Sequence, residues 1–186
     1  MFFFSKEDEN IKFTHSSLEH AYLAILKDDL SSAKAIFEKT DSPRANWGIT
    51  FVEILKGYLK RYPTYFEIRN FLEIDLDFLI KNEKLDYVEQ VLGASDILIN
   101  TNQETYKYIA RVMFENKLYK VAMEYLEKSK RQFYNDPELH FIISKFFLKH
   151  NNFAQALKYI EECLKILPDY YPAILLKNEI LKNLDS

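Results

Sequence analysis

Apolar residues recur along the chain at intervals of three and four, which is the spacing of amphipathic helices. Helix start signals stand ahead of several of these runs. Ser42-Pro43 and Asp136-Pro137 each place a capping oxygen before a proline at the first helical position, where no amide hydrogen is needed. The loops are short, so sequential helices are expected to pack antiparallel. Ten helices are predicted, over residues 16–28, 30–40, 43–61, 64–82, 85–98, 103–115, 119–133, 137–149, 153–166 and 171–184.

The pattern also repeats along the chain with a fixed period. Repeats start near Arg69, Gln103 and Pro137, and a fourth start at Tyr171 is cut short by the C-terminus. A constant period of about 34 residues is typical of stacked helical hairpins. Such arrays present a continuous groove that binds other chains, so the period predicts a function in protein binding but does not identify the partner.

Small residues occupy the places where the two helices of a repeat must cross closely. Ala110 and Ala122 form the small pair in one repeat, and Ser144 and Ala156 stand in the same places one period later. Larger side chains fill the positions around each pair. This arrangement predicts a close helix crossing in both hairpins.

These features together resemble the tetratricopeptide repeat. The small pairs, the aromatic residue at Tyr119 or Phe153 and the proline at Pro168 in the closing turn carry the resemblance. The resemblance is good over residues 103–170. It implies an all-α fold of antiparallel hairpins stacked as a right-handed superhelix that binds other proteins and has no catalytic site.

The resemblance also implies a division of the chain. The repeat pattern is looser over 69–102, where Leu76 and Val88 replace the small pair, and it reappears at 14–47 with Ala21 and Ala33. The predicted parts are an N-terminal arm 1–13, a hairpin 14–47, an irregular inserted helix region 48–68, three repeats 69–102, 103–136 and 137–170, and a C-terminal capping helix 171–186.

The middle of the chain departs from the period. The interval between the start at Thr14 and the start at Arg69 exceeds one repeat by about the length of one extra helix. Either 43–61 and 64–82 form a longer hairpin of their own, or the N-terminal part packs across the array.

Composition narrows the class of protein and of partner. Three glycines and five prolines in 186 residues argue against an all-β fold, which needs many turns. The balance of 28 acids to 25 bases favours neither nucleic acid nor an anionic membrane as a partner. One cysteine fits a reducing compartment, and no apolar run is long enough to cross a bilayer. The first ten residues lack the pattern of a signal peptide, so a cytoplasmic location is expected.

No pattern in the sequence indicates catalysis, a metal or a cofactor. His15 and His20 are five residues apart and no third ligand completes a metal site. Cys163 occupies a slot that requires a small residue, so we interpret it as a packed structural thiol. Glu73 and Asp77 share a helical face, but no base, nucleophile or phosphate-binding loop accompanies them. The protein is therefore predicted not to be an enzyme.

The resemblance also places a set of side chains on the concave face formed by the first helices of the repeats. The predicted peptide-binding groove consists of Lys107, Arg111, Phe114, Phe141, Lys145 and Leu148. Cationic donors next to aromatic anchors suit a peptide that carries acids and large apolar side chains. The alternative is that these charges form only the solvated side of the helices.

Two other functions stay open at this point. The first is a self-assembling structural subunit, in which Phe2–Phe4 or an uncovered N-terminal hairpin packs against a second copy. The second is a small cytoplasmic chaperone of the tetratricopeptide type.

Overall fold

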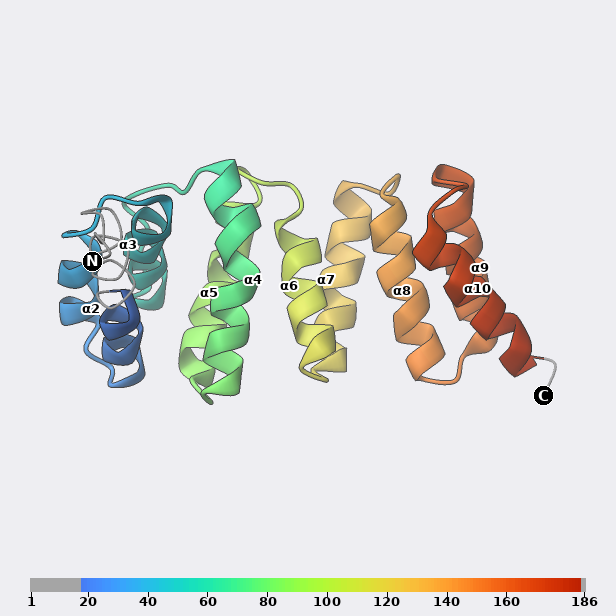
Figure 1. Cartoon of the computed structure of the whole chain (residues 1–186), viewed down its shortest axis with the longest axis horizontal. Helices are drawn as coiled ribbons and strands as arrows, with labels where there is room; N and C mark the ends of the chain where they lie inside the picture. The colour runs from blue at the N-terminus through green and yellow to red at the C-terminus, as the bar shows by residue number, and fades with distance from the viewer. Residues whose placement is uncertain (1–17, 185–186) are drawn as a thin grey trace, which may run out of the picture. The chain divides into compact units, whose positions relative to one another are not determined.

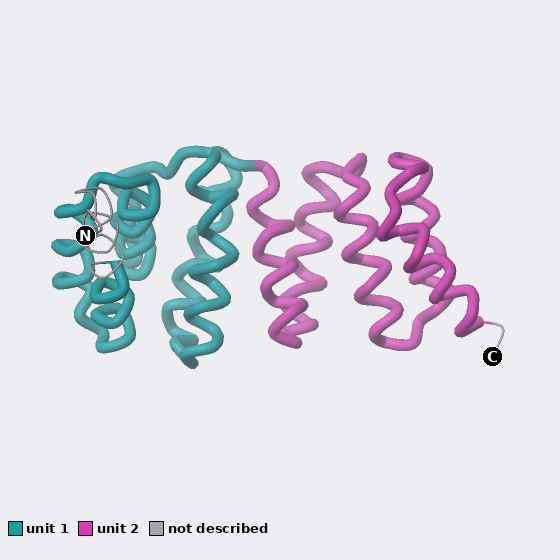
Figure 2. The backbone as a smooth tube through the Cα atoms, in the orientation of Figure 1, with its two compact units in different colours: residues 1–102 teal, residues 103–186 magenta. Residues whose placement is uncertain are grey.

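The computed structural model describes residues 18–184. The chain divides into two compact units, residues 1–102 and 103–186, which we call unit 1 and unit 2 (Figure 2). All regular structure between residues 18 and 184 is helical, without a strand, so the predicted all-α fold class is confirmed. The proposed N-terminal arm 1–13, with its Phe2–Phe4 cluster, lies outside the described residues.

Unit 1 contains an extra helix beyond its two hairpins. Ser42 Oγ accepts a hydrogen bond from the Ala45 amide at 3.1 Å and Pro43 follows the cap, so the predicted helix start is confirmed. A capping box between Thr64 and Glu67 starts the next helix. In its described part, unit 1 consists of a helix over residues 18–26, α2 (Leu30–Phe37), α3 (Pro43–Leu55), α4 (Tyr65–Lys81) and α5 (Leu85–Leu98) (Figure 1).

Helix α3 is the extra element, and it lies in the interior of unit 1. It packs against α2, α4 and α5, and its Trp47, Phe51 and Val52 are fully buried. The approach of α2 is close, because a methyl group added at Gly48 would lie 2.5 Å from the ring of Phe37. Glycine at this position therefore permits the contact between the two helices.

The predicted helix 43–61 is too long, because α3 ends at Leu55. Gly57 has a φ of 76°, a left-handed conformation that glycine adopts without strain and that ends the helix. The segment after it is held by the buried carboxylate of Glu53, which accepts from the backbone amides of Lys60 and Arg61 at 2.9 and 3.0 Å. These hydrogen bonds give the connection to α4 a defined path without helical structure.

A second buried carboxylate fixes the end of this connection. Glu67 accepts two hydrogen bonds from the guanidinium of Arg61, at 2.7 and 3.1 Å. The same guanidinium donates to Thr50 Oγ1 at 2.8 Å, which joins the connection back to α3. The extra helix is therefore oriented by buried, hydrogen-bonded charges as well as by apolar packing.

Unit 2 is built from regular stacked hairpins. Its helices are α6 (Thr105–Glu115), α7 (Tyr119–Gln132), α8 (Pro137–Lys149), α9 (Phe153–Ile166) and α10 (Tyr171–Leu184) (Figure 1). Each packs against the next, and α8 also contacts α6 and α10. The starts of α7 and α9, at 119 and 153, are one period apart, as are those of α8 and α10 at 137 and 171. The predicted period is therefore confirmed.

The predicted close crossings are also confirmed. Ala110, Ala122, Ser144 and Ala156 are all completely buried. Ser144 Oγ donates a hydrogen bond of 2.7 Å to the Ala156 carbonyl, which requires that the backbones of α8 and α9 lie close together. The hairpins of unit 2 have a tetratricopeptide-like fold.

The turns inside the hairpins share a backbone conformation. Glu83, Lys117 and Asn151 each have a positive φ, of 57°, 62° and 55°, and each follows the last by one period of the sequence. Asp28 has the same conformation, with a φ of 62°. A left-handed residue is a common way to end a helix, so the turn repeats together with the helices.

Candidate functional site

A cavity within unit 2 is lined by α6, α8 and α10, by the first residues of α7 and α9 and by the turns between helices. Its volume is about 630 Å³, which is within the range of small-ligand and peptide side-chain sites. The side chains that line it are Phe114, Glu115, Lys117, Tyr119, Lys145, Leu148, Lys149, Asn151, Phe153, Leu176, Glu179 and Asn183. We call it the unit 2 cavity.

Three of the six predicted groove residues line this cavity, namely Phe114, Lys145 and Leu148. Phe141 lies beside it, because the ammonium of Lys145 is 5.8 Å from the ring centroids of both Phe114 and Phe141. At this distance a cation is attracted by the faces of both rings. The structure thus brings four of the predicted residues together in or beside one cavity, where Lys145 is exposed.

Aromatic side chains form a continuous wall around Phe114. Its ring centroid lies 5.7 Å from that of Tyr119 and 6.2 Å from that of Phe146. His150 packs on both neighbours, with centroids 4.8 Å from Tyr119 and 4.4 Å from Phe146. These residues come from the end of α6, the start of α7 and the end of α8, so the hairpin crossing itself assembles the wall.

The charged groups of the cavity are at its surface. Lys117, Lys145 and Lys149 are exposed, as are Glu115 and Glu179, so three cations stand against two acids. Among the described residues, none of the three ammonium groups forms an ion pair with an acid. They can therefore receive the carboxylates of a ligand without first breaking an internal ion pair.

Lys107 does not line the cavity and instead forms buried ion pairs that join α6 to the start of α8. It is only 2% exposed, and its ammonium contacts carboxylate oxygens of Glu104, Asp136 and Glu138 at 2.8, 2.6 and 3.0 Å. Burial acts to lower the pKa of Lys107, but Asp136 and Glu104 outweigh it, so the pKa is raised. Three acceptors satisfy the three donors of an ammonium group, so Lys107 has no donor left for a ligand.

Arg111 is also used within unit 2. Its guanidinium donates to Glu138 at 2.6 Å and lies 5.7 Å from the ring centroid of Tyr108. About a third of its side chain is exposed, so it stands at the edge of the predicted groove. Because Glu138 binds both Lys107 and Arg111, these contacts tie α6 to the start of α8.

Residues of the turns and of α10 line the cavity, although none of them is among the six predicted groove residues. Lys117 and Asn151 line the cavity from the turns, where they share the left-handed conformation. Leu176 and Glu179 line it from α10. Lys117 and Asn151 stand one period apart, and this equivalence is a signal in the sequence that could have pointed to the turns.

Other candidate chemistry finds no support in the described residues. Between residues 18 and 184, no group of three histidine, cysteine or acidic side chains is placed to hold a metal. Cys163 is fully buried, and burial raises the pKa of its thiol to about 11, which makes the thiolate scarce at neutral pH. No helix in the described part of the chain is long and apolar enough to span a membrane.

Comparison with known proteins gives little further information. No protein-family model matches this chain, and no curated protein matches it. One similar solved structure is described as the crystal structure of the APC/C hetero-tetramer Cut9-Hcn1, with 14% identity and a TM-score of 0.46. The match covers 90% of this chain and 42% of that chain. The tetratricopeptide-like fold of unit 2 is supported by its own helix spacing and buried small pairs.

Proposed function

We propose that unit 2 is a non-catalytic protein-interaction module whose cavity binds a peptide segment of a partner protein. The segment would carry large apolar side chains and at least one carboxylate. The observation that carries this proposal is the exposed ammonium of Lys145, which lies over Phe114 and Phe141 at the edge of a cavity with both apolar and charged lining residues.

Each part of the cavity has a matching part in such a ligand. Phe114, Leu148, Phe153 and Leu176 offer apolar surface, and burial of apolar side chains supplies most of the free energy of binding. Lys145 and Lys149 offer charge-assisted hydrogen bonds, which orient the carboxylates and select against basic ligands.

A pair of synthetic peptides tests the proposal. Both are amphipathic, have identical leucine and phenylalanine positions and lack tryptophan, and they differ only in whether glutamate or lysine fills the polar positions. The glutamate peptide should bind the full-length protein, and its affinity should fall by about tenfold when Lys145→Glu is combined with Lys149→Glu. Affinity should also fall as salt rises.

The matched control combines Lys120→Glu with Lys158→Glu, which makes the same change of charge at exposed positions of α7 and α9 outside the cavity. This control should retain the affinity of the unmodified protein. Equal loss in both double variants would show a general effect of net charge and would remove the proposed site.

A further inference from the structure

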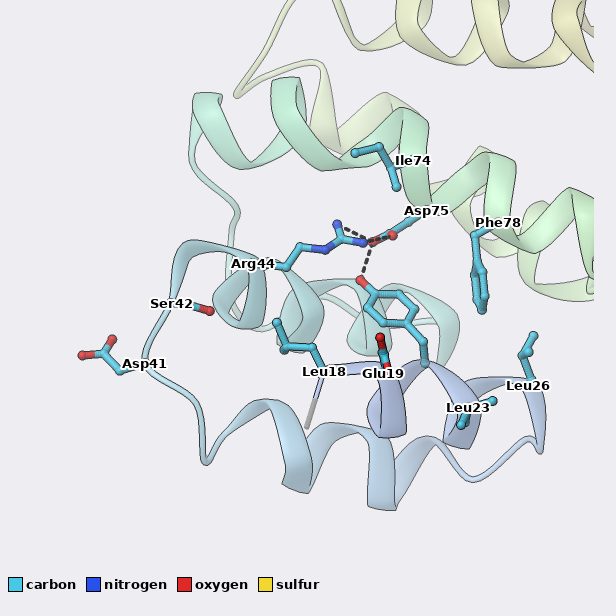
Figure 3. Close-up of a pocket in the computed structure, with 11 residues that line it drawn as sticks. Leu18, Glu19, Leu23, Leu26, Asp41, Ser42, Arg44, Ile74, Asp75 and Phe78 are labelled. Atoms are coloured by element: carbon cyan, nitrogen blue, oxygen red, sulfur yellow. Dashed lines mark hydrogen bonds and ion pairs between the residues drawn. The ribbon is translucent and has the colours of Figure 1, made fainter. Parts of the chain in front are cut away.

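Unit 1 holds a cavity of its own, with a volume of about 880 Å³. Its side walls are formed by the helix over residues 18–26 and by α4, and the start of α3 lines one end (Figure 3). Apolar side chains dominate its lining, among them Leu18, Leu23, Leu26, Ile74 and Phe78. Leu23 and Ile74 are 50% and 58% exposed, so large apolar groups face the open space. We call it the unit 1 cavity.

A buried carboxylate forms the polar part of its lining. Asp75 is completely buried and accepts hydrogen bonds from Tyr22 Oη at 3.0 Å and from Trp47 Nε1 at 2.6 Å. The guanidinium of Arg44 binds both of its oxygens, as Figure 3 shows. The same guanidinium lies 4.9 Å from the ring centroid of Tyr22 and 4.8 Å from that of Phe71.

This arrangement determines the charge that a ligand meets. Arg44 is the cation of the cavity, and its charge is offset by Asp75 in a fixed pair. The other charged groups in the lining are Glu19 and Asp41, both exposed. Neither carboxylate has a hydrogen-bond or ion-pair partner among the described residues. The unit 1 cavity therefore combines an apolar surface with two exposed negative charges.

We propose that the unit 1 cavity is a second docking site, for a partner segment with large apolar side chains flanked by lysine or arginine. The apolar walls bury the large side chains, and Glu19 and Asp41 pair with the basic groups. An acidic segment is disfavoured, because its carboxylates would lie near two others and the one cation is already occupied. The charge preference is opposite to that of the unit 2 cavity, and this inference does not depend on the function proposed for unit 2.

Trp47 provides a direct readout. It is the chain's single tryptophan, and its indole N–H donates to the carboxylate that lies at the cavity. The lysine peptide defined above should change the fluorescence of Trp47 and the NMR shift of its indole proton in a saturable way. Its affinity should fall at least tenfold when Glu19→Lys is combined with Asp41→Lys.

The matched control combines Asp86→Lys with Glu89→Lys, which are exposed positions on α5 outside the lining of the unit 1 cavity. Affinity for the lysine peptide should stay within twofold of the unmodified protein. Equal loss in the two double variants, or equal response of Trp47 to the glutamate peptide, would overturn the proposal.

Two alternative occupants of the unit 1 cavity, a second copy of the chain and the chain's own N-terminal segment, are tested with variants of the same full-length protein. Sedimentation should give the same mass for the unmodified chain and for Leu23→Glu with Ile74→Glu; conversion of a dimer into a monomer would assign the cavity to a second copy and overturn the proposal. Replacement of Phe2, Phe3 and Phe4 by serine should leave the affinity for the lysine peptide unchanged. A gain of tenfold or more would assign the cavity to the chain's own N-terminal segment, with the same consequence.

Discussion

Unit 1 and unit 2 are both built from packed helices, but different contacts hold the helices together. Unit 2 stacks regular hairpins whose crossings are made by four completely buried small residues, and one buried ammonium, that of Lys107, links α6 to the start of α8. Unit 1 accommodates an extra helix, α3, and orients it with three buried or half-buried ion pairs, Lys34–Glu53, Arg44–Asp75 and Arg61–Glu67. We therefore expect these directional contacts, together with apolar packing, to orient the additional helix of unit 1.

The largest loss of stability is expected from Asp75→Ala in unit 1. The substitution leaves the guanidinium of Arg44 without its anion and removes the acceptor of Trp47 Nε1 and Tyr22 Oη. Breaking one partner of a buried pair costs roughly 3–5 kcal/mol, so unit 1 should unfold at much lower urea concentration. Urea unfolding followed by the fluorescence of Trp47 measures this loss.

The reference change is made at an exposed ion pair of unit 2: Lys177→Ala removes a 2.9 Å pair with Glu161 in which both side chains are about a third exposed or more. It should cost less than about 1 kcal/mol, as measured by the urea dependence of the helical circular dichroism. Similar losses in the two variants would contradict the view that buried charges orient the extra helix.

An effect smaller than that of Asp75→Ala is expected from Gly48→Ala. The new methyl group would lie 2.5 Å from the ring of Phe37, so α2 and α3 must move apart or the ring must shift. Overpacking of this kind costs roughly 1–3 kcal/mol. Gly93→Ala is the control, because nothing lies within 4 Å of the added group and alanine favours the helix. Thermal unfolding should show a lower melting temperature for the first variant only.

The smallest effect is expected from mild acid. At Glu67, burial acts to raise the pKa of the carboxyl, but hydrogen bonds from Arg61 and from the Thr64 amide outweigh it and the pKa is lowered. At Glu53 burial likewise acts to raise the pKa, and Lys34 with the amides of Arg61 and Lys60 lowers it overall. Because burial opposes the ion pairs at both sites, the net contribution of each group is modest.

The direction in which stability changes with pH follows from the number of protons that the folded and unfolded states bind. The unfolded chain takes up protons near the ordinary value of 4.5, while the folded chain keeps these carboxylates ionised. The contribution of Glu53 and Glu67 to the free energy of unfolding of unit 1 should therefore decrease as the pH falls below about 4.5. Glu67→Gln should flatten this decrease in urea titrations at several pH values. An unchanged pH dependence in that variant would show that Glu67 does not contribute.

The regular part of the fold could be predicted because each of its determinants is local. Alternating small and large residues, helix caps and turns recur with a fixed period, and a residue such as Ala156 has the same environment as its equivalent Ala122. The inserted region could not be predicted in this way. The path of residues 56–64 depends on Glu53 and Glu67, whose partners Lys34 and Arg61 cannot be assigned from spacing alone.

The candidate site was predicted in part for the same reason. Phe114, Phe141, Lys145 and Leu148 occupy repeating positions of the first helices, so the resemblance could place them together. Lys107 occupies an equivalent position but is buried, because three acids converge on it from before α6 and from the start of α8. Such long-range charge pairing does not recur with the period of the repeats, so it could not be predicted from the sequence pattern.

The most direct test of the central claim is the NMR titration of the full-length protein with the glutamate peptide, observed at the backbone amides. We expect saturable shift changes at Phe114, Lys145, Leu148 and Leu176, which disappear in Lys145→Glu with Lys149→Glu and persist in Lys120→Glu with Lys158→Glu. Shift changes spread evenly over both units, or equal binding by the two double variants, would contradict the assignment of the unit 2 cavity as a peptide-binding site.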